Sequence, residues 1–379
     1  QGEQCCGDEG EGAAHDATLG RAGSAPPPIL RGRWSPDRGT FVVDRAVSVA
    51  QALVVSTRRR GTSTVPFVSL VSLVSALVSL VVLAGAVALP AGAATATYVF
   101  KRASSPARTL VYSGATGKLV ATFTDGSRTV NLVGPSRTFA EPTYTTATVT
   151  TSAWVRLAPS AFAGTVDQAW LTARLADTSP DVLALTMQYI VGAPAIVSGG
   201  LQIAGDAAYG PLLADGTRGE GSDFNDYLGV TWTYPSGSDA PEADQFRSLD
   251  CSGFMRMVLG YRSGLRLTLS PDGGASLPRR SFEQAASAPG IVVIPNTGVV
   301  PSSRSALAPG DLVFFDADSG DGTQIDHVGM FLGRDSGGAD RFVSSRKSAN
   351  GPTMGDLSGR SVLNGTGYYA SAFRTARRV

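Results

Sequence analysis

The spacing of apolar residues divides the chain into stretches of different period. From residue 97 to 153, short runs of β-branched and aromatic residues alternate with glycine-containing turns, a pattern typical of short β-strands. Beyond them the apolar residues recur at helical spacing, which predicts two helices, within 166–175 and 182–189. We therefore expect residues 97–200 to form a small accessory region of strands followed by helices. The predicted strands cover residues 110–112, 119–123, 129–133 and 143–154.

A second unit is predicted from residue 201 to 379. Asp250 is a preferred N-cap residue, so a helix is predicted from there to about residue 259. A loop to residue 308 follows, and then the continuous apolar runs 312–315 and 328–332, which are typical of buried strands. A strand-like stretch at 341–345 and a tail ending in two arginines complete the unit.

The first 96 residues have a different character. Residues 1–54 lack sustained periodicity, so we expect them to be disordered or to be an artefact of the assigned gene start. Within 55–96, three arginines precede the uncharged run 65–89, and small residues at 94–96 fit a processing site, which together predict an export signal. The alternative is an uncleaved anchor, because 25 uncharged residues can span a bilayer. Either reading predicts a secreted or cell-envelope protein, attached to the membrane through 65–89 if the signal is not cleaved.

Composition excludes two classes of function. The 379 residues include 32 basic and 31 acidic side chains, and a net charge of +1 provides no field that attracts nucleic acid. The chain has only three Cys and two His, and beyond residue 60 only Cys251 and His327 remain. A structural zinc site needs four such ligands, so we expect no metal in this part.

Cys251 and His327 are the candidate chemistry. A Cys in the first turn of a helix meets unpaired backbone N–H groups and the positive end of the helix dipole, both of which favour a thiolate. The same N–H groups, including that of Ser252, can face a developing oxyanion. His327 heads an apolar strand and is the one imidazole available as a base. The alternative is an inert buried Cys and a hydrogen-bonded His at a strand end.

Four motifs in order resemble those of the NlpC/P60 cysteine peptidases, over roughly residues 224–379. The resemblance implies a papain-like α+β fold, in which a helix bearing the Cys packs on an antiparallel sheet bearing the His. It also implies cleavage of amide bonds in peptidoglycan stem peptides, with Cys251 as nucleophile, His327 as base and acid, and no cofactor. The motifs are Asp250-Cys251-Ser252-Gly253-Phe254, Leu277-Pro278-Arg279 with Ser281 and Gln284, Pro309-Gly310-Asp311-Leu312-Val313-Phe314-Phe315, and His327-Val328-Gly329 through Gly333.

The sequence departs from the family pattern at the third site residue. A polar residue on the next strand, usually His, orients the base in this family, and that position falls on Ser344, or on Ser345 if the register slips by one. Asp326 is a weaker candidate, because adjacent strand residues point to opposite faces.

A tyrosine ahead of the Cys lines the oxyanion site in the family, and here Tyr227 and Tyr234 are the candidates. The alternative for either ring is ordinary aromatic packing.

We therefore expect an exported cysteine peptidase that hydrolyses peptidoglycan stem peptides, with an accessory region that restrains or positions the catalytic unit. One rival is a catalytically weak or inactive wall-binding protein on the same fold, which the serine at the orienting position supports. Another is an acyltransferase or amidase that keeps the nucleophile. The bond cut and the oligomeric state are left open.

Overall fold

The computed structural model describes residues 32–35, 40–43, 97–318 and 320–379. The chain divides into two compact units. In the smaller unit the described residues form one antiparallel hairpin of β1 (Gly32–Ser35) and β2 (Thr40–Val43). The larger unit holds every described residue from 97 onward. No helix among the described residues has the length and apolar character needed to cross a bilayer, and the predicted export segment lies outside those residues.

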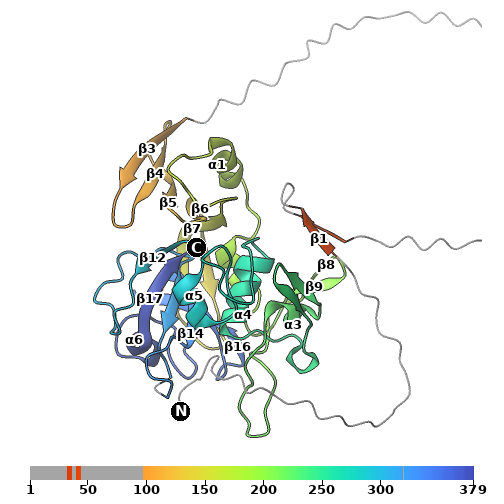
Figure 1. Ribbon diagram of the computed structural model, residues 1–379. Coiled ribbons are helices and arrows are strands. Elements are labelled where there is room, and N and C mark those ends of the chain that lie inside the picture. The colour runs from red at the N-terminus through yellow and green to blue at the C-terminus, as the bar shows by residue number, and fades with distance from the viewer. Residues whose placement is uncertain (1–31, 36–39, 44–96, 319) are drawn as a thin grey trace, which may run out of the picture. The chain divides into compact units, whose positions relative to one another are not determined.

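An antiparallel meander of five strands begins the larger unit (Figure 1). Two helices follow, and aspartate side chains cap both of their N-termini. The predicted strands at 110–112, 119–123 and 129–133 are confirmed. The fourth begins later than predicted, because residues 141–145 form a turn. The elements are β3 (Tyr98–Ala103), β4 (Arg108–Ser113), β5 (Leu119–Thr124), β6 (Thr129–Ala140), β7 (Thr148–Leu157), α1 (Gln168–Leu175) and α2 (Val182–Thr186).

The second sheet has six antiparallel strands in the order β12-β17-β13-β14-β15-β16. Its central strands are buried on both faces, as their continuous apolar runs predict. The C-terminal stretch that the sequence analysis describes as a tail is not an appendage, because residues Phe373–Arg378 form the strand β17 between β12 and β13. The strands are β12 (Ile291–Ile294), β13 (Leu312–Phe315), β14 (His327–Arg334), β15 (Asp340–Arg346), β16 (Gly351–Thr353) and β17 (Phe373–Arg378).

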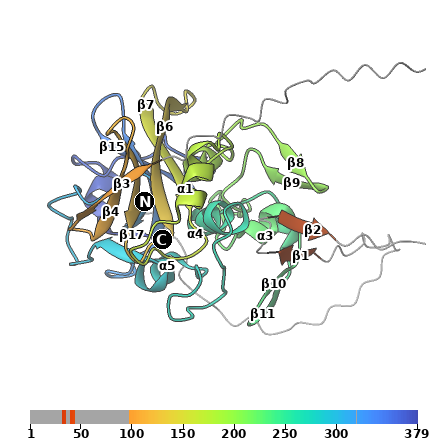
Figure 2. The ribbon, with the colours of Figure 1, turned by 90° about the horizontal axis from the view of Figure 1, so that it is seen from above.

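Helices cover this sheet and complete an α+β arrangement. The helix predicted from Asp250 is α4 (Cys251–Met255), which continues as the π-helix η2 (Arg256–Tyr261) and packs on β14. The predicted loop to residue 308 is wrong in part, since it contains α5 (Ser281–Ser287) as well as β12. In Figure 2, α3 and α4 lie to one side of β6 and β7. The remaining elements are β8 (Ile196–Ser198), β9 (Leu201–Ala204), α3 (Phe224–Leu228), β10 (Trp232–Tyr234), β11 (Gly237–Asp239), η1 (Ala243–Gln245) and α6 (Tyr368–Ala372).

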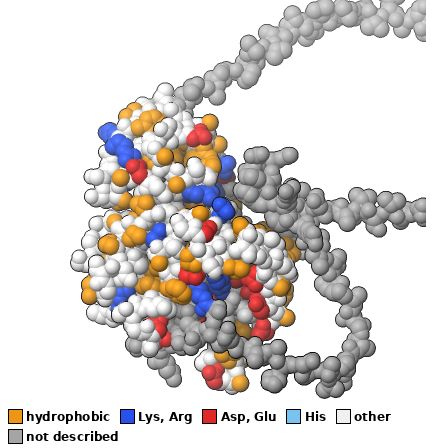
Figure 3. All heavy atoms as spheres, viewed as in Figure 1, with side chains coloured by type: hydrophobic (Ala, Val, Ile, Leu, Met, Phe, Trp, Pro, Cys, Tyr) orange, Lys and Arg blue, Asp and Glu red, His pale blue; other side chains and the backbone are white. Residues whose placement is uncertain are grey.

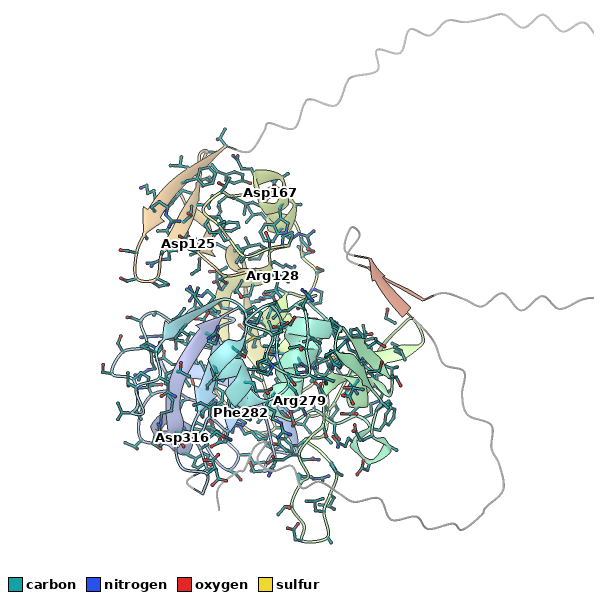
Figure 4. All side chains as sticks on the ribbon, viewed as in Figure 1. Asp125, Arg128, Asp167, Arg279, Phe282 and Asp316 are labelled. Carbon is teal, nitrogen blue, oxygen red and sulfur yellow. The ribbon has the colours of Figure 1, made fainter. Side chains whose placement is uncertain are left out.

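The two sheets are joined by hydrogen bonds to residues near the chain's C-terminus. The Val379 carbonyl oxygen accepts from the backbone N–H groups of Arg128 and Thr129, at 3.0 and 2.6 Å. Figure 4 labels Arg128 where the meander meets the second sheet. At a second point, the buried Glu141 accepts hydrogen bonds from the Thr353 hydroxyl and the Met354 N–H. The meander therefore supports the sheet that carries His327.

Candidate active site

Cys251 is the first residue of α4. Asp250 caps the helix in extended conformation, and its Oδ1 accepts a hydrogen bond of 2.7 Å from the Gly253 N–H. Gly253 is required sterically, since a Cβ there would lie 2.2 Å from the Ser222 carbonyl oxygen. The cap and the close approach together fix the helix start, and they place the Cys251 side chain in the buried interior.

Arg279 holds the Asp250 carboxylate. Its two Nη atoms lie 2.7 and 3.2 Å from the two carboxylate oxygens, and Nη1 also donates to the Ser252 hydroxyl. Burial alone would raise the pKa of Asp250, but the Arg279 charge and hydrogen bonds outweigh it and hold that pKa below its ordinary value. Figure 4 labels Arg279 beside α4 and α5. Asp250 is therefore a carboxylate with its own counter-ion, one residue before the candidate nucleophile.

His327 is the first residue of β14 and is 1% exposed. Its ring packs against Phe315, its partner on β13, and against Tyr369 of α6, with centroid distances of 5.7 and 5.3 Å. The Cys251 Sγ lies 4.0 Å from the carbonyl oxygen of Asp326. The fold thus brings the candidate thiol against the peptide group that joins Asp326 to the candidate base.

Ser344 lies on the strand beside His327. The pairing of Met330 with Val343 places it opposite Gly329, and a Cβ at Gly329 would come within 3.1 Å of the Ser344 Cβ. By the alternation of strand residues, Ser344 shares the face of His327. Its hydroxyl accepts a hydrogen bond of 3.2 Å from the buried Arg346 Nε. Among the described residues, no hydrogen bond joins Ser344 to His327.

The two alternatives to Ser344 are directed elsewhere. The Ser345 hydroxyl donates to the Leu249 carbonyl oxygen, two residues before Cys251. Asp326 directs its carboxylate at the loop that follows β13, where Oδ2 accepts from the N–H groups of Ala317 and Asp318. Ser345 therefore supports the Cys251 segment, and Asp326 supports the loop.

The two tyrosines predicted to line the site are both buried in hydrogen-bonded surroundings. The Tyr227 hydroxyl donates to the Gly205 carbonyl oxygen. The Tyr234 hydroxyl accepts from Arg256 at 2.6 Å, and burial raises its pKa. Arg256 in turn pairs with Asp223 beneath α4. These contacts make Tyr234 part of the support for the helix.

Tyr209 is a third tyrosine near Cys251, and the sequence analysis did not include it among the candidates to line the site. Ala208 forms a parallel bridge with Ser248, and its carbonyl oxygen accepts from the Leu249 N–H at 2.8 Å. Tyr209 therefore lies beside the segment that leads into Cys251, and its ring is fully buried. The sequence does contain a signal, since Tyr209 and Gly210 begin a glycine-rich stretch. A long insertion separates that stretch from the Cys.

Three carboxylates beside His327 are the group in the described part of the chain that can hold a metal. They belong to Asp316, Asp321 and Asp326, and one oxygen of each lies within 4.8 Å of the others. Burial raises the pKa of Asp326 to about 7, and the charges of Asp321 and Asp316 add to this rise against two backbone hydrogen bonds that lower it. Elsewhere, acidic and basic side chains are interspersed on the face that Figure 3 shows.

Comparison with known proteins agrees with these motifs. Residues 231–360 match the model of the NlpC/P60 family, a range that includes Cys251, His327 and Ser344. Among curated proteins there is no match. A solved structure from Staphylococcus aureus, described as similar to a lipoprotein of the NLP/P60 family, is 19% identical with a TM-score of 0.24. That match covers 56% of this chain, which spans about half (48%) of the other protein. Residues 231–360 of this chain are therefore similar to the NlpC/P60 family.

Proposed function

We propose that this chain is a cysteine peptidase that hydrolyses amide bonds in the stem peptides of peptidoglycan. The match of residues 231–360 to the NlpC/P60 family supports a cell-wall peptidase-like function, and the finer assignment is ours. One observation carries it: the Cys251 Sγ, at a capped helix start, lies 4.0 Å from the carbonyl oxygen of the residue before His327. A nucleophile and a base on two adjoining elements are the minimal parts of acyl transfer.

The proposed reaction has two halves. His327 takes the proton of the Cys251 thiol, and the thiolate attacks the amide carbonyl carbon, while N–H groups of the first turn of α4 stabilise the oxyanion. The C–N bond breaks as His327 returns the proton to the leaving amine. Water then attacks the thioester, with His327 as base, and releases the carboxylate product and the free thiol. No step needs a cofactor.

Ser344 is the proposed orienting residue, by its position in the family pattern and its place on the face of His327. A serine oxygen can accept from an imidazole N–H, but it carries no charge and stabilises imidazolium less than a carboxylate does. We therefore expect Ser344 to contribute less than Cys251 or His327.

Digestion of purified peptidoglycan tests the proposal. Wild-type protein should release soluble stem-peptide fragments, and Cys251→Ala and His327→Ala should each lower the rate by at least about 10³-fold. Ser287→Ala is the matched control, because its hydroxyl bonds to the Glu283 carbonyl oxygen within α5, away from Cys251. Thermal melts of all variants verify folding, and the fragment masses identify the bond.

Three outcomes would contradict the peptidase. Release that is unchanged by Cys251→Ala excludes the thiol mechanism. Binding to the wall without release of peptides establishes the wall-binding alternative. Products that carry a new acyl acceptor in place of water, or that result from cleavage outside the stem peptide, establish the acyltransferase or amidase.

The proposal includes export, because its substrate lies outside the cytoplasmic membrane. The sequence segment 55–96 is expected to direct it. Cell fractionation with N-terminal sequencing tests this: a mature N-terminus near residue 97 is expected, and a full-length chain in the membrane fraction would favour the anchor.

A further inference from the structure

The loop between β13 and β14 gathers acidic side chains directly in front of His327. Asp316 follows β13 and Asp326 precedes β14, while Asp321 lies at the middle of the loop. One carboxylate oxygen from each lies within 4.8 Å of the other two. Figure 4 labels Asp316 near α6, and its N–H donates to the carbonyl oxygen of Ala372, where that helix ends. Two strand ends and a helix end therefore hold the cluster.

The buried oxygen of Asp326 points to a missing ligand. This residue is 0% exposed, and its Oδ2 accepts from the N–H groups of Ala317 and Asp318, at 2.7 and 2.6 Å. Its Oδ1 is equally buried, yet it has no hydrogen-bond partner among the described residues, and the same holds for Asp321 Oδ1. A buried carboxylate oxygen without a partner is strongly unfavourable, so native proteins pair it or place it on a metal.

The charges around the cluster do not balance. Within the described part of the chain, the four carboxylates of Asp316, Asp318, Asp321 and Asp326 form one ion pair, between Asp316 Oδ2 and Arg374 Nε of β17 at 3.2 Å. Four carboxylates and one guanidinium leave a formal charge of −3. A divalent cation would reduce the charge to −1.

We propose that Asp316, Asp321 and Asp326 bind a divalent cation with the coordination chemistry of Ca²⁺. The three ligands are all carboxylate oxygens, which hard cations prefer. Two ligand oxygens of one Ca²⁺ lie at most about 4.8 Å apart, twice the usual bond of about 2.4 Å, so oxygens that lie within 4.8 Å of one another can share this ion. Mg²⁺ needs shorter bonds in a near-octahedral arrangement, which an irregular loop satisfies less well.

Binding there has a consequence for the site, which rests on the proposed function. Asp326 precedes His327, and its carbonyl oxygen is the group that the Cys251 Sγ contacts. A cation on the Asp326 side chain fixes the peptide on which both candidate catalytic groups meet. Asp326 is thus a positioning residue, which acts through His327 and does not touch substrate.

Metal-dependent melting of the full chain tests the site without any substrate. After treatment with EDTA and its removal, millimolar CaCl₂ should raise the melting temperature by about 2–5 °C, with MgCl₂ raising it less. Calorimetric titration should give one Ca²⁺ per chain. Asp321→Asn should lose at least about tenfold in affinity, and the matched control Asp244→Asn, an exposed residue of η1, should keep it.

The Asp321→Asn variant keeps the test decisive, because Asp321 is only partly buried and its loss should not prevent folding. No melting shift with Ca²⁺, Mg²⁺ or Mn²⁺ would overturn the site, and so would equal shifts in wild type and Asp321→Asn. Since no substrate enters these measurements, an inactive protein that still shows the shift would refute only the peptidase. In an active protein, EDTA should lower the rate and Ca²⁺ restore it, with no such response in Asp321→Asn.

Discussion

Two buried aspartates each precede one of the candidate catalytic residues, and their surroundings are opposite. Asp250, before Cys251, is held by Arg279 and by the cap to Gly253, and its pKa lies below the ordinary value. Asp326, before His327, has two backbone N–H donors and acidic neighbours, and its pKa is raised to about 7. Both side chains are fully buried, and burial raises the pKa of any carboxyl group. The two pKa values therefore differ because the nearest charge is the Arg279 guanidinium at Asp250 and other carboxylates at Asp326.

The comparison divides the site into two halves. The half around Cys251 and Asp250 is preorganised, and the half around His327 and Asp326 is conditional, because its geometry depends on the solution. The chain itself supplies the cation on the Cys251 side, where a second buried pair, Arg256 with Asp223, lies beneath the same helix. The His327 side has an excess of carboxylates, and we infer that its counter-charge comes from solution. The geometry at Cys251 should therefore be insensitive to solution conditions, whereas the geometry at His327 should respond to pH and to divalent ions.

The largest expected effect comes from breaking the preorganised half. Asp250→Ala removes the helix cap and leaves the largely buried Arg279 without this carboxylate. We expect a loss of about 3–5 kcal/mol in the free energy of unfolding, because the buried Arg279 loses its nearest carboxylate, keeping the more distant Asp223 at 3.7 Å, and the helix loses its cap. Urea unfolding measures it. A loss below about 1 kcal/mol would show that the pair contributes only as an exposed one does.

The stability of Arg279→Met as a function of pH tests whether Arg279 is the counter-ion that stabilises the Cys251 half. The folded pKa of Asp250 is lowered, so its contribution to stability is present above its unfolded pKa of about 3.9 and is lost as pH falls through the folded pKa. Without Arg279, burial dominates and the pKa rises. We expect Arg279→Met to be about 2–4 kcal/mol less stable at pH 7, with a smaller deficit at pH 3. Urea unfolding between pH 3 and 7 tests this, and a deficit that is constant with pH would contradict it.

The sequence predicted the site better where local rules decide the structure. Capping by Asp250 and the apolar run of β14 are local features, and both elements begin at the predicted residues. Strand β17 was missed because its sequence, Phe-Arg-Thr-Ala-Arg-Arg, contains three arginines. Arg378 is buried there because its guanidinium binds both oxygens of Asp311, the residue before β13. A pairing over 67 residues cannot be read from local pattern.

The same limit explains the other omissions. Tyr209 reaches the Cys251 segment through a parallel bridge to a stretch about 40 residues later, and the acidic loop forms a cluster only when β13 and β14 pair. Scarcity of Cys and His argued against zinc, but it gives no information about cations that prefer oxygen ligands. The expectation of no metal rests on Cys and His ligands, and it does not extend to the carboxylates of this loop.

A smaller effect is expected when the conditional half is neutralised. The folded pKa of Asp326, about 7, exceeds the unfolded value of about 3.9, so this group lowers stability progressively as pH rises between them. In EDTA at pH 8, Asp326→Asn should be about 1–2 kcal/mol more stable than wild type, because one charge beside Asp316, Asp318, Asp321 and Arg374 is removed. At pH 4 the two should be equal. In millimolar Ca²⁺ the order should reverse, and urea unfolding in both buffers provides the measurement.

The smallest expected effect is at Ser344, within the conditional half. Its hydroxyl accepts one hydrogen bond, from Arg346 Nε, so Ser344→Ala should cost no more than about 1 kcal/mol of stability. If it orients His327, kcat should fall about 3- to 10-fold with KM unchanged, and the acid limb of the pH–rate profile should move. Ser345→Ala is the matched control, since its hydroxyl bonds to the Leu249 carbonyl oxygen on the preorganised side and should leave that limb in place. If the acid limb of the pH–rate profile moved in Ser345→Ala and not in Ser344→Ala, Ser345 would be the residue that orients His327.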